Sequence, residues 1–143
     1  MCNQRGSLVW IVWVAGVMMG CDPAPLPPSG TGAREAAQRY CDALLEKDWP
    51  RAYAALHPDS RARYSASRFA RLAERYCREL GFEPEPARIR FCQEQGTRTV
   101  AHIVWKGQKA AHEHFYKEVI ILHSTPAGWG VVLPQNFGSG RRR

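Results

Sequence analysis

The sequence lacks an apolar run long enough to cross a bilayer. Its longest, Leu8–Met19, covers twelve residues, about 18 Å as a helix, whereas a membrane core needs roughly 20 residues. None of the five cysteines forms a Cys-x-x-Cys pair, so a dithiol redox enzyme has no support. With 143 residues, 45% of them hydrophobic, the chain has room for one globular domain rather than two.

The sequence has fewer acidic than basic residues, with 13 Asp and Glu against 20 Lys and Arg, which gives a net charge of +7. This balance suggests nucleic-acid binding only if the charge is concentrated. Residues 33–135 carry 16 basic and 12 acidic side chains, spread along their length. We therefore expect no nucleic-acid partner, and the remaining excess favours an anionic membrane surface.

The N-terminus has the features of an export signal, because Arg5 precedes the short apolar run. The segment Met18–Cys21 (Met-Met-Gly-Cys) then resembles the lipobox of bacterial lipoproteins, in which the Cys is diacylated after cleavage. This resemblance implies a signal peptide over residues 1–20, a lipid anchor on Cys21 and a periplasm-facing protein of the cell envelope. Asp22 resembles an inner-membrane retention signal, so the inner membrane is favoured, with the outer membrane as the alternative.

The rest of the chain divides by composition. Residues 22–32 contain four prolines and two glycines, so residues 21–32 form a semi-extended tether behind the lipidated Cys. Residues 33–135 form the folded domain. Residues 136–143, rich in Gly and Arg, form a flexible basic tail.

Within the domain, helical periodicity comes first and strand alternation second. Apolar residues at three- and four-residue spacing predict helices over residues 34–47 and 67–80, with a short helix from Pro50 to about His57. Alternation predicts strands over residues 88–93, 97–105, 111–123 and 129–133, with a turn over residues 106–109 and a bend or bulge in the long third strand. In the first strand Ile89 and Phe91 should face the core and Cys92 should face outward.

Three stretches point to a family. They are the segment Glu46–Tyr53 (Glu-Lys-Asp-Trp-Pro-Arg-Ala-Tyr) after the first helix, the helix that contains Phe69, and the final strand Gly128–Val132 (Gly-Trp-Gly-Val-Val). Together they resemble the nuclear transport factor 2-like superfamily, which shares its cone with ketosteroid isomerase. The resemblance spans residues 33–135 and implies an α+β fold, with N-terminal helices packed on a curved four-stranded antiparallel sheet.

The same resemblance implies a pocket inside the cone. Its candidate lining residues are aromatic: Tyr40, Tyr53, Phe69, Trp105, Phe115 and Trp129. Such a pocket suits a small apolar ligand or an aliphatic peptide, although the same side chains could simply form the core. We therefore expect a non-enzymatic binding or scaffolding domain with no cofactor and an unidentified protein or small-molecule partner. An isomerase-like or lyase-like enzyme that uses the pocket is the alternative.

No catalytic residue can be assigned from the sequence. The carboxylates Asp42, Asp48 and Asp59 lie on or beside helices, and their contexts do not match the catalytic motifs of the cone enzymes. Glu113 and Glu118 lie on one strand with opposite parity, so at most one of them faces inward.

Histidines offer a candidate metal site. His112 and His114 share a face of one strand, and His102 lies on the preceding strand. A hairpin with Lys106 opposite Lys109 places His102 on the other face, whereas a register shift of one residue would gather all three for zinc or copper. Exposed histidines on a polar face are the favoured interpretation.

Three cysteines remain in the domain. Cys41 and Cys77 lie on the apolar stripes of two helices that should pack together, and a disulfide between them could contribute roughly 3–4 kcal/mol. Cys77–Cys92 is the rival pairing.

Overall fold

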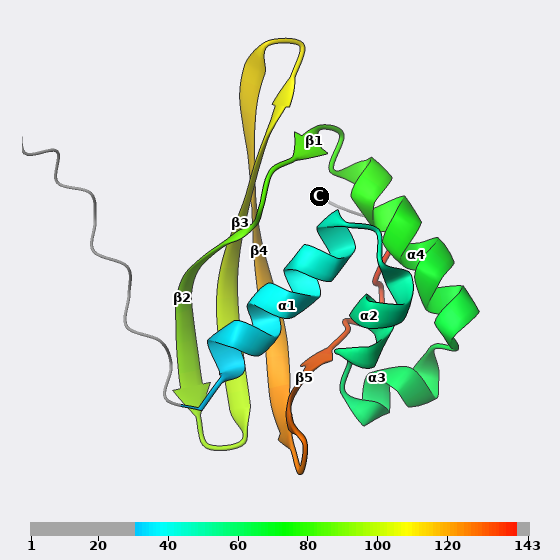
Figure 1. Ribbon diagram of the computed structural model, residues 1–143, viewed down its shortest axis with the longest axis vertical. Helices are drawn as coiled ribbons and strands as arrows, with labels where there is room; N and C mark the ends of the chain where they lie inside the picture. The colour runs from blue at the N-terminus through cyan, green and yellow to red at the C-terminus, as the bar shows by residue number, and fades with distance from the viewer. Residues whose placement is uncertain (1–30, 140–143) are drawn as a thin grey trace, which may run out of the picture.

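The computed structural model describes residues 31–139, which form helices followed by strands (Figure 1). The helices are α1 (Ala33–Leu45), α2 (Trp49–Ala54), α3 (Pro58–Arg63) and α4 (Ala66–Glu79). The strands are β1 (Glu83–Pro84), β2 (Arg88–Gln95), β3 (Arg98–Lys109), β4 (His112–Thr125) and β5 (Gly128–Val132). The expected α+β architecture is confirmed. The signal peptide, Cys21, the tether up to residue 30 and residues 140–143 lie outside the described part.

Local sequence explains the helix ends. Pro50 occupies the first turn of α2, where its missing N–H costs nothing. The Ser65 Oγ accepts the backbone N–H of Arg68 at 3.3 Å and so caps α4. Gly81 follows α4 with φ +71°, the left-handed conformation in which glycine commonly ends a helix.

Helix α3 is an element that the sequence analysis missed. Its first residue is Pro58, and the Nδ1 of His57 accepts the N–H of Asp59. The buried Ser60 hydroxyl accepts the backbone N–H of Leu133 at 2.9 Å, which fixes α3 against the chain that leaves β5. A proline in the first turn was the available signal.

The sheet is an antiparallel meander of β2, β3, β4 and β5, and β1 pairs with the distal end of β3. The expected turn at residues 106–109 is wrong, because pairing continues until Lys109 lies opposite His112. The chain reverses at Ala110 and Ala111, which both have positive φ, 49° and 65°, as in the tight turns that suit a twisted hairpin. Gly107, which suggested the turn, instead permits the close approach of β1.

A bulge changes the faces of β2. Pairing with β3 shifts between Ile89 and Phe91, so one extra residue lies between them and they no longer share a face. Phe91 is 41% exposed and stacks on His102, whereas Cys92 packs against the core. The sequence prediction was therefore right for Ile89 and wrong for Phe91 and Cys92. The bulge expected in the third strand is found in β2 instead.

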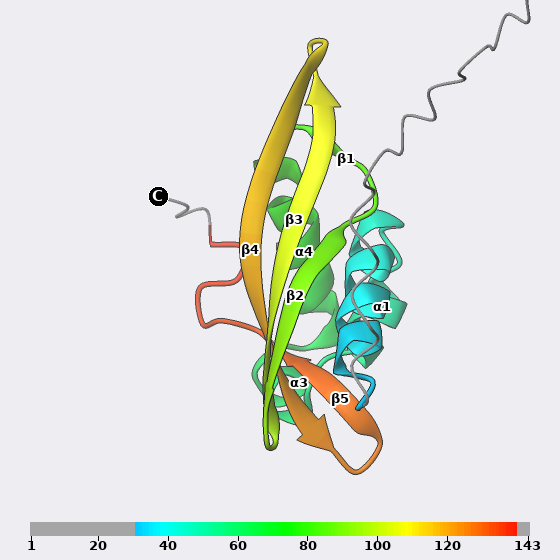
Figure 2. The same cartoon turned by 90° about the vertical axis from the view of Figure 1, so that its left-hand side faces the viewer.

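The helices cover one face of the sheet, and the view turned by 90° shows β2, β3 and β4 in front of them (Figure 2). Between the two layers lies a single hydrophobic core. Phe137 belongs to it, being 8% exposed and stacked on Phe69 and Tyr76. The flexible tail expected from residue 136 is therefore wrong for residues 136–139.

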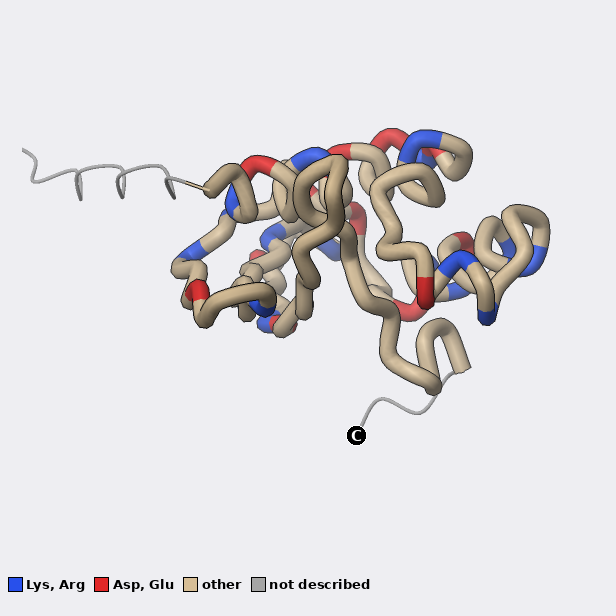
Figure 3. The backbone as a smooth tube through the Cα atoms, turned by 90° about the horizontal axis from the view of Figure 1, so that it is seen from below, with Lys and Arg blue, Asp and Glu red and all other residues tan. Residues whose placement is uncertain are grey.

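No helix within residues 31–139 is long and apolar enough to cross a bilayer. Basic and acidic residues are interspersed along the backbone (Figure 3).

Candidate functional site

The predicted pocket aromatics do not line one pocket. Tyr40, Phe69 and Trp105 are at most 2% exposed and fill the interior of the cone, with Tyr53 packed against them. Phe115 is 60% exposed and lies on the outer face of the sheet, so its assignment to the pocket is wrong. Phe115 is four residues from Val119, which is 51% exposed, so the two side chains share the outer face of β4.

One carboxylate does face the interior. Glu118 on β4 accepts hydrogen bonds at Oε2 from the hydroxyl of Tyr76 and, at 3.3 Å, from the indole N–H of Trp105. Glu113 points to the other face and pairs with Lys106 at 2.7 Å. This is the division that strand parity required, since neighbours two apart share a face and these two are five apart.

The space beside Glu118 is small. The cavity there has a volume of about 40 Å³ and is lined by Tyr40, Tyr76, the middle of β4 and the end of β5. Burial, and next the negative charge of Glu118, hold the pKa of Tyr40 well above its usual range near 10.0. A cavity of this size admits a water molecule but no substrate, so the carboxylate and its donors form a polar network inside the core.

A much larger hollow lies elsewhere, at the end of the molecule where α1 and α4 finish. It is a groove of about 850 Å³ between these two helix ends, β1 and the distal end of β3. Leu44, Leu45, Trp49, Phe82 and Pro84 give it apolar walls. We call it the distal groove. Its volume falls in the range of small-molecule sites.

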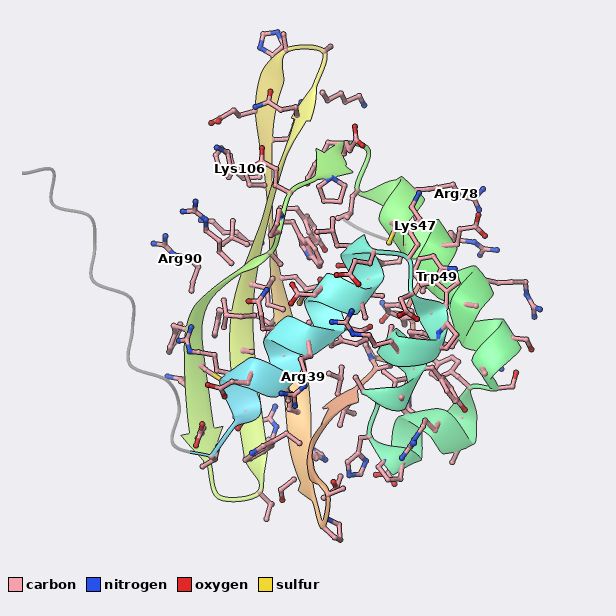
Figure 4. All side chains as sticks on the ribbon, in the orientation of Figure 1. Arg39, Lys47, Trp49, Arg78, Arg90 and Lys106 are labelled. Carbon is pink, nitrogen blue, oxygen red and sulfur yellow. The ribbon has the colours of Figure 1, made fainter. Side chains whose placement is uncertain are left out.

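Charged side chains line the same groove. Lys47, Arg78 and Lys109 supply three cations, and Glu74 and Glu83 supply two anions. Figure 4 shows Lys47, Trp49 and Arg78 gathered where α1, α2 and α4 meet. Lys47 owes its place to a positive φ of 56°, by which the chain turns sharply between α1 and α2. The groove thus offers apolar contact together with an excess of positive charge.

The structure separates the histidines. His102 pairs with Val119 and stacks on Phe91 on the outer face, whereas His114 pairs with Gly107 and stacks on Phe82 on the inner one. The register differs from the predicted one by an even number of residues, so the faces are those of the predicted hairpin. The three histidines therefore do not share the face that a three-histidine metal site needs. Within residues 31–139, no group of three or more His, Cys, Asp or Glu side chains is placed so that it could hold a metal ion.

The cysteines occupy three environments. Cys41 is fully buried on α1, and burial, followed by the charges of Glu118 and Asp42, raises the pKa of its thiol. Cys77 on α4 points its Sγ toward the carbonyl oxygen of Leu44, 3.8 Å away. Burial also raises the pKa of Cys92, which is half-exposed. The Cys41–Cys77 disulfide stays a prediction.

We expect the reduced protein to lose stability in alkali. The pKa values of Cys41 and Tyr40 are raised in the fold, so the unfolded chain releases these protons first, near pH 8.5 and 10. Below those pH values each group contributes its full share to the free energy of unfolding. As the pH rises above them, the free energy of unfolding falls by up to about 1.4 kcal/mol per pH unit for each group. Urea denaturation between pH 8 and 11 measures the slope. Tyr40→Phe should make it shallower above pH 10, and an unchanged slope would contradict the assignment.

Sequence reasoning missed the distal groove because its walls come from segments far apart in the chain. Leu45 ends α1, Arg78 lies in the last turn of α4, and Lys109 ends β3. The only available signal was the Glu46–Tyr53 segment, which contains Lys47 and Trp49. The structure brings these residues together through the pairing of β1 with β3.

Several solved structures have a chain path similar to that of this protein. No protein-family model matches the sequence, and no curated protein is significantly similar to it. The solution structure of RPA3114, a SEC-C motif containing protein from Rhodopseudomonas palustris, matches with a TM-score of 0.49 and 14% identity, over 63% of this chain and 66% of that one. A structure described as "Rd1NTF2_04 with long sheet" matches with a TM-score of 0.48 and 14% identity, over 69% of this chain and 94% of that one. The fold described above rests on the order and packing of this chain's own elements.

Proposed function

We propose that this protein is a lipid-anchored lipoprotein of the bacterial envelope whose domain binds, without catalysis, an aliphatic chain that carries an anionic group. The lipobox-like segment Met18–Cys21 supports the anchor. The distal groove carries the binding proposal, because it joins apolar walls to three cations. The inner membrane is the favoured location.

The groove chemistry favours this ligand class. An aliphatic chain placed against Leu44, Leu45 and Phe82 leaves water at roughly 25 cal/mol for each Å² of apolar surface buried. Lys47, Arg78 and Lys109 then lie at the wall where an anionic end group would be neutralised. Glu74 and Glu83 in the same wall disfavour a ligand that is anionic along its whole length.

An isomerase-like or lyase-like enzyme in the cone is the weaker alternative. Such an enzyme would need the inward carboxylate to meet substrate in an apolar pocket. Glu118 instead accepts two hydrogen bonds from core side chains beside a cavity of about 40 Å³.

We expect Cys21 to carry the lipid. Cells that express the full chain and are fed an alkyne analogue of palmitate should label the wild-type protein, while Cys21→Ala should lose the label completely. Cys2→Ala is the matched control, because Cys2 precedes the apolar run and is removed with the signal peptide. Label that persists in Cys21→Ala, or is lost from Cys2→Ala alone, would refute the anchor.

Binding can be mapped on the anchored protein with a photoreactive diazirine analogue of octanoate, followed by peptide mass spectrometry. We expect labelling of residues 44–49 and 77–84, competition by octanoate, and no competition by octylamine. Leu45→Asp should reduce the labelling at least about tenfold, because it places a negative charge in the apolar wall that the acyl chain would contact. Val119→Asp introduces the same side chain at a site that is 51% exposed on the outer face, and it should leave labelling unchanged. Labelling spread over the whole chain, or unaffected by Leu45→Asp, would rule the groove out.

A further inference from the structure

A second hollow of the described residues lies where α1, α2, α3 and the β4–β5 turn meet. It measures about 340 Å³. Its floor consists of small or apolar residues such as Ala54, Ala55 and Leu56, and Trp129 forms one wall. Three arginines, one from each of the three helices, surround it: Arg39, Arg51 and Arg61. We call it the arginine hollow.

The charge of the arginine hollow is largely unneutralised. No carboxylate lines it. Arg51 directs Nη1 to Glu46 at 2.6 Å, and both side chains stay about half exposed. Arg39 and Arg61 form no ion pair within residues 31–139. Three guanidinium groups around a concave surface are suited to phosphate oxygens, which they can bind through paired hydrogen bonds.

The arginine hollow also adjoins the point where the N-terminal segment reaches the domain. The indole N–H of Trp129 donates to the carbonyl oxygen of Thr31 at 3.1 Å, so one wall of the hollow touches the first described residue. Cys21 is ten residues earlier, and no chain of that length can span more than about 36 Å. Helix α1 runs from this end to the distal groove (Figure 1), a distance of about 20 Å.

We propose that the arginine hollow binds the phosphates of anionic phospholipids and holds this end of the domain against the membrane. The proposal rests on the lipid anchor of the proposed function, which brings the hollow to a bilayer. Charge complementarity selects the anionic headgroup, and the short tether supplies a high local concentration of it. The distal groove shares no lining residue with the arginine hollow, so a phospholipid phosphate in the hollow leaves the walls of the groove uncovered.

Hydrogen exchange of the full lipidated protein on vesicles tests whether the arginine hollow binds anionic phospholipids. The vesicles are phosphatidylcholine alone or phosphatidylcholine with about 30% phosphatidylglycerol, a composition chosen to approach an anionic leaflet. On the anionic vesicles we expect exchange to slow in residues 50–64 and 124–130. Each surface arginine should raise the equilibrium constant for contact between the hollow and the anionic vesicle by up to about fivefold. The triple variant Arg39→Gln, Arg51→Gln, Arg61→Gln should lose this protection.

The matched control removes the same charge elsewhere. Arg71, Arg88 and Arg90 are exposed and lie outside the hollow, so their triple change to Gln should keep the protection. Equal exchange on both vesicle types, or equal loss in both triple variants, would overturn the proposal. Protection by inorganic phosphate on neutral vesicles would assign the hollow to a free anion and likewise overturn it. Vesicle flotation reports the anchor separately, because acyl chains carry the protein with either lipid.

Discussion

Trp105→Ala is expected to lower the free energy of unfolding by about 3–5 kcal/mol. The indole is 1% exposed at the centre of the core, and its N–H donates to Glu118. Its removal leaves a cavity between sheet and helices and takes one of two donors from an inward carboxylate. Small domains are stable by only about 5–15 kcal/mol, so this one change threatens the fold. Urea denaturation followed by circular dichroism measures it.

Trp129→Ala provides the comparison for Trp105. Trp129 is half-buried at the edge of the sheet and donates to the carbonyl of Thr31, so its loss should cost about 1 kcal/mol. If Trp105→Ala does not fold, Trp105→Phe keeps most of the volume and should still cost about 1–2 kcal/mol through the lost hydrogen bond. A cost for Trp105→Ala no larger than that for Trp129→Ala would contradict the structure.

Gly107→Ala is the second change with a large expected effect, about 3 kcal/mol of stability. A Cβ on Gly107 would lie 2.0 Å from the carbonyl oxygen of Glu83 and 2.4 Å from the ring of Phe82. The backbone oxygen cannot move aside, so β1 must separate from β3. Because Phe82, Glu83 and Pro84 line the distal groove, octanoate photolabelling should fall together with stability.

Gly96→Ala separates this steric effect from conformational strain. Gly96 has φ +59°, and a Cβ added there would meet no atom within 4 Å, so alanine should cost only about 1 kcal/mol, from the left-handed backbone. Photolabelling of the groove should be unaffected, since Gly96 lies in the β2–β3 turn. If the two substitutions had equal effects on both stability and labelling, the close approach of β1 would be refuted.

The order and type of most elements could be predicted because each depends on neighbouring residues. Spacing of Tyr40, Cys41 and Leu44 at three and four positions predicts α1, and alternation predicts β2 to β5. The errors lie where the pairing of strands determines which face a side chain is on or where the chain turns. The bulge after Ile89 moved Phe91 to the outer face, and β1 made Gly107 a contact point rather than a turn.

The candidate sites show the same limit more strongly. The sequence indicated aromatic pocket walls, yet Tyr40, Phe69 and Trp105 are buried in the hydrophobic core. Neither the distal groove nor the arginine hollow has a linear motif. Arg39, Arg51 and Arg61 lie in three helices, and only the packing of those helices against the β4–β5 turn encloses a space between them.

The sequence alone determined the α+β class, the order of α1, α2, α4 and β2 to β5, and the opposite faces of Glu113 and Glu118. These follow from periodicity along one segment, which the backbone fixes locally. The tertiary structure decided which aromatics are core, where the hollows lie and which charges surround them. Those properties depend on distances between segments far apart in the chain, which the packing of helices on the sheet sets and no local pattern encodes.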